Sequence, residues 1–126
     1  MKANLVLAWL WILLGFVGGS LLGLGFHREN WLGGYASHQR RLYRLGHISF
    51  FGLAIVNLLF YFTAQQLQLH GASIQAASWG FVVGAITMPV CCVVMAHSRI
   101  GHALFAVPVS SLIAGGLLTF LQIISL

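Results

Sequence analysis

Residues 4–26 read NLVLAWLWILLGFVGGSLLGLGF and contain no charged side chain. A helix of about 20 apolar residues is long enough to cross the hydrocarbon core of a bilayer. Lys2 precedes the stretch, as a basic residue does in a signal peptide, but the apolar run is too long for a signal core and ends without a small-x-small cleavage site. We therefore expect residues 4–26 to form a membrane-spanning helix.

Three more apolar stretches follow, over residues 46–64, 76–96 and 103–124. Of the 126 residues, 60% are hydrophobic and 6% are charged, and Glu29 is the single acidic residue. No water-soluble surface can be assembled from this composition, so the lipid bilayer is the expected solvent. Four spans use most of the length, which predicts an all-α fold: a single integral membrane domain over residues 1–126, built as a four-helix transmembrane bundle.

The basic residues predict how the helices are oriented. The net charge is +5, and the connection after the first span holds four of the six basic residues, namely Arg28, Arg40, Arg41 and Arg44. Arg99 lies in the third connection, whereas the opposite side has only Lys2. Because Lys and Arg resist translocation, both connections should be cytoplasmic and both termini non-cytoplasmic. Anionic lipid headgroups also account for the positive charge, so we expect no nucleic acid partner.

Glycines in two spans predict close contacts between helices. Gly15, Gly19 and Gly23 recur every four residues in the first span, and Gly80 and Gly84 repeat the spacing in the third. Small residues at this spacing leave a groove that lets another backbone approach. The neighbour is another helix of the same chain, a second copy or another membrane subunit, or a flat cofactor, and the spacing leaves these alternatives open.

Histidines lie close to the ends of the spans. Alternating chain direction brings four of them to one membrane face: His27, His47, His97 and His102. His38 belongs to the same side, and only His70 lies opposite. Imidazole is a common metal ligand and the usual axial ligand of b-type haem, so four such helices could enclose iron, copper or zinc. Histidines near an interface also bond to headgroups, backbone or water without any ligand, and this interpretation stays open.

The second span adds a pattern that favours haem. Arg40, Arg44 and His47 are spaced i, i+4 and i+7, so they share a helix face if the helix begins early. An axial histidine with arginine one turn nearer water places iron in the apolar layer and pairs the propionates with guanidinium. We expect non-covalent haem b, because the chain has no CxxCH sequence. The expected ligands are His47 first and His97 or His102 second, with Arg41 or Arg44 on the propionates; a quinone pocket is a further alternative.

A line of soft ligands in the third span suggests a different metal. Met88, Cys92 and Met95 follow at i, i+4 and i+7, and Cys91 is adjacent. Thioether and thiolate groups favour Cu(I), although the same residues are common fillers of packed helices. Adjacent cysteines make a strained disulfide, so both are expected to be free thiols. Pro89 lacks an N–H and should free a carbonyl group in the protein interior.

Two functional classes are poorly supported. Proton- or cation-coupled transport usually needs a carboxylate within the membrane, and none lies in the four predicted spans. No Ser-His-acid set or carboxylate pair can be identified for hydrolysis, so we expect no catalytic activity of the chain's own. The sequence favours a small membrane subunit of a larger assembly, respiratory or otherwise engaged in electron transfer, that binds haem b. The alternatives are a cofactor-free accessory or scaffold subunit and a copper-handling membrane protein.

Overall fold

The computed structural model describes residues 1–98 and 101–126, and this part of the chain is helical without strands. Its elements are α1 (Lys2–Phe26), the short 3-10 helix η1 (Trp31–Gly33), α2 (His38–Gln66), α3 (Ala72–His97), α4 (Gly101–Leu104) and α5 (Ala106–Ile124). Four helical stretches are long and apolar enough to cross a membrane, the fourth formed by α4 and α5 together. The prediction of an all-α fold with four membrane spans is therefore confirmed.

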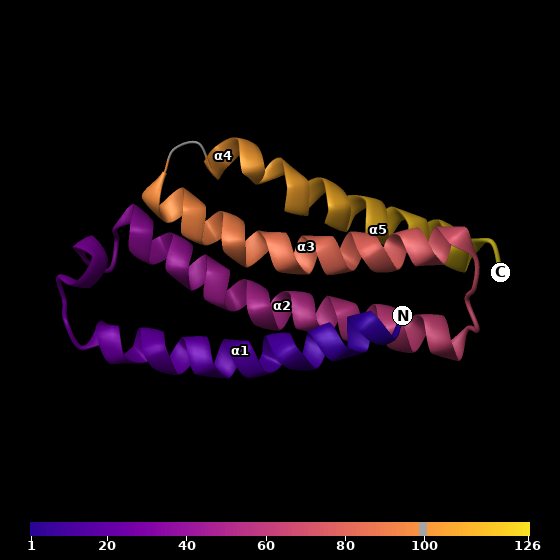
Figure 1. Ribbon diagram of the computed structural model, residues 1–126, viewed down its shortest axis with the longest axis horizontal. Coiled ribbons are helices and arrows are strands. Elements are labelled where there is room, and N and C mark those ends of the chain that lie inside the picture. Colours follow the sequence, from indigo (N-terminus) through magenta and orange to yellow (C-terminus); the bar gives the residue numbers. More distant parts are fainter. Residues whose placement is uncertain (99–100) are drawn as a thin grey trace.

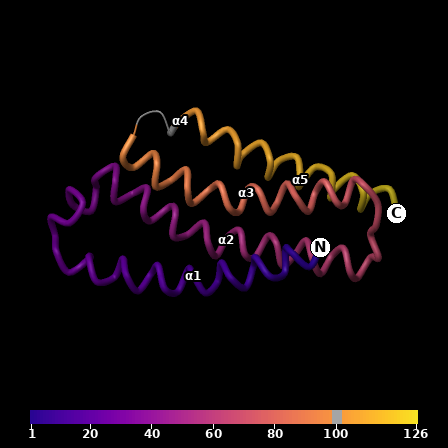
Figure 2. Tube along the Cα trace, in the orientation of Figure 1, coloured from indigo at the N-terminus to yellow at the C-terminus, as the bar shows by residue number. Residues whose placement is uncertain are grey.

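The four spans lie in a row (Figure 1). α1 packs against α2, α2 against α3, and α3 against α5. Figure 2 traces the chain up and down through this row, with both termini at one end and the α1–α2 connection, the end of α3 and the start of α4 at the other. We call the second end the loop end. Which end faces the cytoplasm stays a prediction from the arginines.

α2 begins at His38, eight residues before the expected boundary at position 46. The Ser37 hydroxyl caps the helix by accepting a hydrogen bond from the backbone N–H of Arg40, at 3.1 Å. Three arginines expected in a long loop therefore lie on the helix, and His47 lies inside the helix rather than at its start. The length of the apolar stretch predicts only the part of α2 that crosses the membrane, because the first turns of the helix carry charged side chains. The other spans begin and end within four residues of the expected positions.

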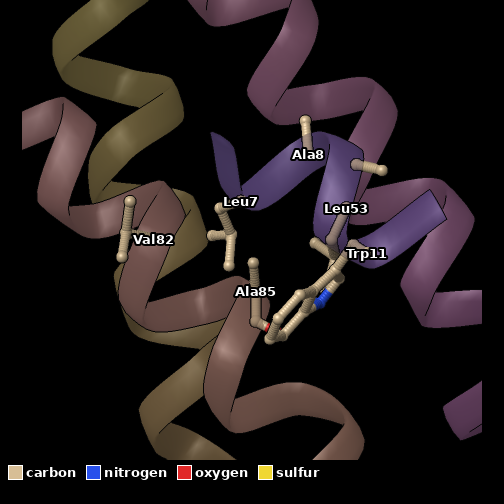
Figure 3. Close-up of a cluster of buried hydrophobic side chains, with 7 residues drawn as sticks. Leu7, Ala8, Trp11, Leu53, Val82 and Ala85 are labelled. Atoms are coloured by element: carbon tan, nitrogen blue, oxygen red, sulfur yellow. The ribbon is translucent and has the colours of Figure 1, made fainter. Parts of the chain in front are cut away.

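The carbonyl group freed by Pro89 has a partner in another helix. α3 runs through Pro89, which offers no N–H to the carbonyl of Ala85 one turn earlier. The indole N–H of Trp11, on α1, donates to that carbonyl oxygen at 3.0 Å. Figure 3 shows the two residues side by side in a buried cluster. The predicted interior carbonyl is thus bonded across the α1–α3 contact.

A second proline breaks the fourth span. Pro108 cannot donate to the carbonyl of Leu104, and the helix is interrupted at Phe105, between α4 and α5. The thiol of Cys91, on α3, donates to the Leu104 oxygen at 3.4 Å. Each carbonyl group that a proline leaves without a helical partner therefore accepts a hydrogen bond from a side chain of another helix.

Two apolar clusters and one polar network hold the row together. The first cluster joins α1, α2 and α3 (Figure 3) and contains Leu7, Ala8, Trp11, Leu53, Ala54, Val82 and Ala85. The second lies nearer the α2–α3 connection and contains Phe60, Ala64, Leu69, Ile74, Ala77 and Phe81. The buried Asn4 side-chain amide donates to Asn57 Oδ1 at 2.9 Å and to the Ser78 carbonyl at 3.2 Å. These bonds join three helices, and the fully buried Asn57 also donates from its own amide to the Leu53 carbonyl at 2.8 Å.

The glycine spacing serves contacts within the chain. A Cβ atom at Gly15 would lie 2.7 Å from the Phe51 ring, and one at Gly80 would lie 2.8 Å from the backbone oxygen of Ser111. Gly84 faces Leu112 in the same way. By contrast, no described atom lies within 4 Å of a Cβ built at Gly23. Most of the predicted groove positions therefore admit side chains or backbone of neighbouring helices.

Candidate functional site

An apolar groove of about 590 Å³ lies between α1, α2 and α3. Its walls are formed by Trp11, Leu14, Gly18, Leu21 and Leu22 of α1, by Tyr43, Gly46, His47 and Phe50 of α2, and by Ile86, Pro89, Val90, Val93 and Val94 of α3. Polar side-chain atoms in this lining come from Trp11, Tyr43 and His47. Trp11 is already bonded to Ala85, and Tyr43 is bonded to His97. Among the polar lining atoms of the described residues, His47 Nδ1 is the one that is buried without a hydrogen-bond partner.

The imidazole of His47 sits in a notch made by glycines of α1. A Cβ at Gly19 would lie 2.8 Å from His47 Cε1, and one at Gly18 would lie 3.9 Å from Nδ1. The ring meets Phe51 edge to face, with centroids 5.5 Å apart and planes at 90°. Nδ1 is buried and has no hydrogen-bond partner in the part of the chain that the structure describes. A buried polar atom without a partner is costly, and such atoms often mark a site that a ligand completes.

A second, more polar cavity of about 500 Å³ lies at the loop end. It is lined by His38, Met95, Ala96, His97, Ser98 and His102. The Tyr43 hydroxyl and His97 Nε2 are 2.8 Å apart and share a hydrogen bond. Because Tyr43 also lines the apolar groove, it connects His97 to the groove that holds His47. Residues 43 and 47 are one helical turn apart, so their spacing in the sequence already places them on the same face of α2.

The structure separates the four histidines that the sequence grouped. His47 lies in the apolar groove, nine residues or about 14 Å along α2 from its first residue. His97 and His102 share the second cavity, and His27 is exposed at the end of α1. No group of three or more His, Cys, Asp or Glu side chains in residues 1–98 and 101–126 is placed to hold a metal ion. The histidines therefore do not form one ligand set around a bare ion.

The predicted propionate partners do not line the groove. Arg44 stacks on the Tyr35 ring, with Cζ 4.1 Å from the ring centroid, and Arg41 is exposed. Arg40, which shares a face with Arg44 and His47 as predicted, is buried against aromatic rings at the loop end. Sequence spacing identified the shared face, but it did not reveal the aromatic residues that turn the guanidinium groups away from the groove.

The sulfur-bearing residues of α3 have different neighbours. Cys91 donates to Leu104, whereas the Cβ of Cys92 lies 3.2 Å from a Cβ built at Gly46 of α2. Both thiols are free, as predicted, and both are buried. Met88 packs against the first apolar cluster, and Met95 lines the second cavity.

No known family model, curated protein or solved structure matches this chain. Its function is therefore inferred from the geometry of the groove and from the chemistry of the residues that line it.

Proposed function

We propose that this chain is a small membrane subunit that binds non-covalent haem b in the groove between α1, α2 and α3, with His47 as the first axial ligand. The observation that carries the proposal is the imidazole of His47, which lines an apolar groove and whose buried Nδ1 has no hydrogen-bond partner in the described residues. Neutral imidazole is the usual axial ligand of b-type haem, and an apolar surround suits the porphyrin face.

The walls of the groove support a flat ligand. Gly18 and Gly46 line the groove without side chains, and a Cβ at Gly18 would lie 3.9 Å from His47 Nδ1. The remaining lining is mainly Leu, Val, Ile and Phe. His97, the second-ligand candidate, lies outside the groove lining, and its Nε2 shares a hydrogen bond with Tyr43, which does line the groove. Binding of His97 to the same haem would require that hydrogen bond to break. We assign no propionate contact to Arg41 or Arg44, because neither lines the groove.

The proposal is tested by adding haem to the full chain in detergent and following the Soret band. Wild-type protein and the His70→Ala variant, which changes an exposed histidine at the other end, are expected to bind equally. His47→Ala should weaken binding by at least about tenfold, since even outer-shell changes at metal sites cost 10- to 100-fold. Equal titrations of wild type and His47→Ala would reject His47 as the ligand.

A quinone is an alternative occupant of the same groove, because its carbonyl oxygen would need one donor and its ring would need apolar walls. A short-chain ubiquinone analogue is therefore titrated in parallel with the same variants. If the chain binds the quinone in a way that depends on His47 and does not bind haem, the groove remains the proposed site, and quinone replaces haem as its ligand.

A cofactor-free accessory subunit is the second candidate, and the outer face of α5 favours it. α5 packs on α3, and its other side exposes Ile113, Leu117, Phe120 and Ile124. Lipid or another membrane subunit can cover such a face. This candidate predicts that alanine variants at four histidines assemble and support electron transfer as wild type does: His27, His47, His97 and His102. No contact in the described residues favours copper handling in the same way. Cys91 contacts α4 and Cys92 contacts α2, so the two thiols do not face a common site.

A further inference from the structure

Two arginines at the loop end are held together on one aromatic surface. Arg40 Cζ lies 5.8 Å from the Tyr35 ring centroid, and Arg44 Cζ lies 4.1 Å from the same centroid. Arg40 also lies 4.8 Å from the Phe26 ring centroid and 6.0 Å from that of Trp31. We call these five residues the arginine cage. Cation–π contacts position guanidinium groups, but they do not neutralise charge.

In the described residues, the arginine cage contacts the single acidic residue through backbone and not through its carboxylate. Glu29 is the single acidic side chain of the sequence, and its contact with Arg40 runs through its backbone oxygen, 3.4 Å from Nη1. Arg40 is only 6% exposed. Within the described residues, Arg40 Nε and Arg44 Nη1 are buried and have no hydrogen-bond partner. Two like charges that are close together and poorly hydrated repel each other strongly unless an anion is present.

We propose that the arginine cage binds a phosphate group, supplied by an anionic phospholipid at the headgroup level of the loop end. Guanidinium presents several N–H donors in a fixed plane that matches phosphate oxygens, and the two unpartnered nitrogens supply such donors. Basic pockets between membrane helices bind lipid headgroups by the same chemistry.

The depth of the arginine cage fits this ligand. Arg40 is the third residue of α2, ahead of the apolar stretch, and Trp31 and Tyr35 are residue types that favour the membrane interface. Tyr35 covers both guanidinium groups but is itself 72% exposed, so it is the part that moves aside when the anion enters. The site does not use His47 or the apolar groove, so it stands or falls independently of the proposed function.

The test uses the full chain in detergent and measures the thermal unfolding midpoint as ligand is added. The probes are phosphatidylglycerol, diacylglycerol as the matched lipid without phosphate, and inorganic phosphate. Arg44→Gln is the main variant, and Arg41→Gln is its control, because Arg41 is an exposed arginine on the same helix. Arg40→Lys, which keeps the charge but removes the guanidinium plane, is a second variant in case full loss of Arg40 disturbs packing.

Phosphatidylglycerol should stabilise wild type and Arg41→Gln alike, and Arg44→Gln should weaken its apparent affinity by about tenfold or more. Arg40→Lys should give an intermediate loss. Inorganic phosphate acting with the same dependence on Arg44 would identify free phosphate as a source and uphold the site. Equal effects of phosphatidylglycerol on Arg41→Gln and Arg44→Gln, or equal stabilisation by diacylglycerol, would overturn the proposal.

Discussion

The indole N–H of Trp11 donates to the carbonyl oxygen of Ala85, at 3.0 Å, across the contact between α1 and α3. Ala85 is the residue whose helical partner is removed by Pro89, so one sequence feature creates the acceptor and another supplies the donor. Trp11 and Pro89 also line the apolar groove, which ties the stability of this contact to the shape of the candidate site.

Replacing Trp11 by Phe should destabilise the folded chain by about 1 kcal/mol beyond the packing change, because it leaves the Ala85 carbonyl without a donor. Trp9→Phe is the control, since Trp9 is 63% exposed. Denaturant unfolding in mixed micelles measures both. A cost for Trp9→Phe as large as that for Trp11→Phe would show that the hydrogen bond contributes nothing.

The dependence on Pro89 is tested by a double-mutant cycle. In a Pro89→Ala background, residue 89 regains an N–H for the Ala85 carbonyl, so the Trp11→Phe change should cost clearly less than in wild type. The same cost in both backgrounds would contradict the link between proline and tryptophan.

The loss of stability caused by a Gly→Ala substitution should depend on how closely the new Cβ atom approaches a neighbouring helix. Gly80→Ala should be the most destabilising, by about 1 to 3 kcal/mol, because the new Cβ meets the Ser111 backbone oxygen at 2.8 Å and backbone yields little. Gly116→Ala on the facing helix should be neutral or slightly stabilising, since no described atom lies within 4 Å of its Cβ position and alanine favours helix. Thermal unfolding in detergent gives the order. Similar losses for both variants would show that the α3–α5 crossing is looser than described.

The sequence predicted those features of the fold that depend on the length of apolar stretches and on spacing along a helix. The run at 4–26 and the freed carbonyl before Pro89 are both found as expected. α2 begins eight residues before the expected boundary, because the length of the apolar run does not report a capped, charged first turn.

The candidate site was less predictable, because it depends on which side chains meet across helices. Spacing placed His47 and Arg44 on one face of α2, but it did not show that Tyr35 attracts Arg44 while the glycines of α1 enclose His47. Likewise, the sequence placed four histidines at one end of the molecule, yet His47 lines the apolar groove, His97 and His102 line the second cavity, and His27 lines neither.

The buried hydrogen bonds among Asn4, Asn57 and Ser78 should contribute measurably to the free energy of unfolding. Asn57→Ala removes the acceptor of the Asn4 amide and should cost about 1 to 2 kcal/mol, and Asn4→Ala combined with it should cost less than the two single changes added together. Asn30→Ala, in the exposed connection after α1, is the control. Strictly additive costs would mean that the two amides do not act as one unit.

The arginine distribution predicts that residues 27 and 102 face the cytoplasm. Single cysteines at these positions, in a background with Cys91 replaced by Ser and Cys92 by Ala, should be labelled by a membrane-impermeant thiol reagent only from the cytoplasmic side. Labelling of the two positions from opposite sides would contradict the four-span topology, and labelling of both from outside would reverse the orientation.

The visible absorption spectrum of the full chain, purified in detergent from haem-replete cells, tests the central claim most directly. The wild-type protein should carry a Soret band that shifts on reduction, and His47→Ala protein purified in the same way should have lost it. A folded wild-type protein without a Soret band, or an undiminished band in His47→Ala, would contradict haem binding through His47.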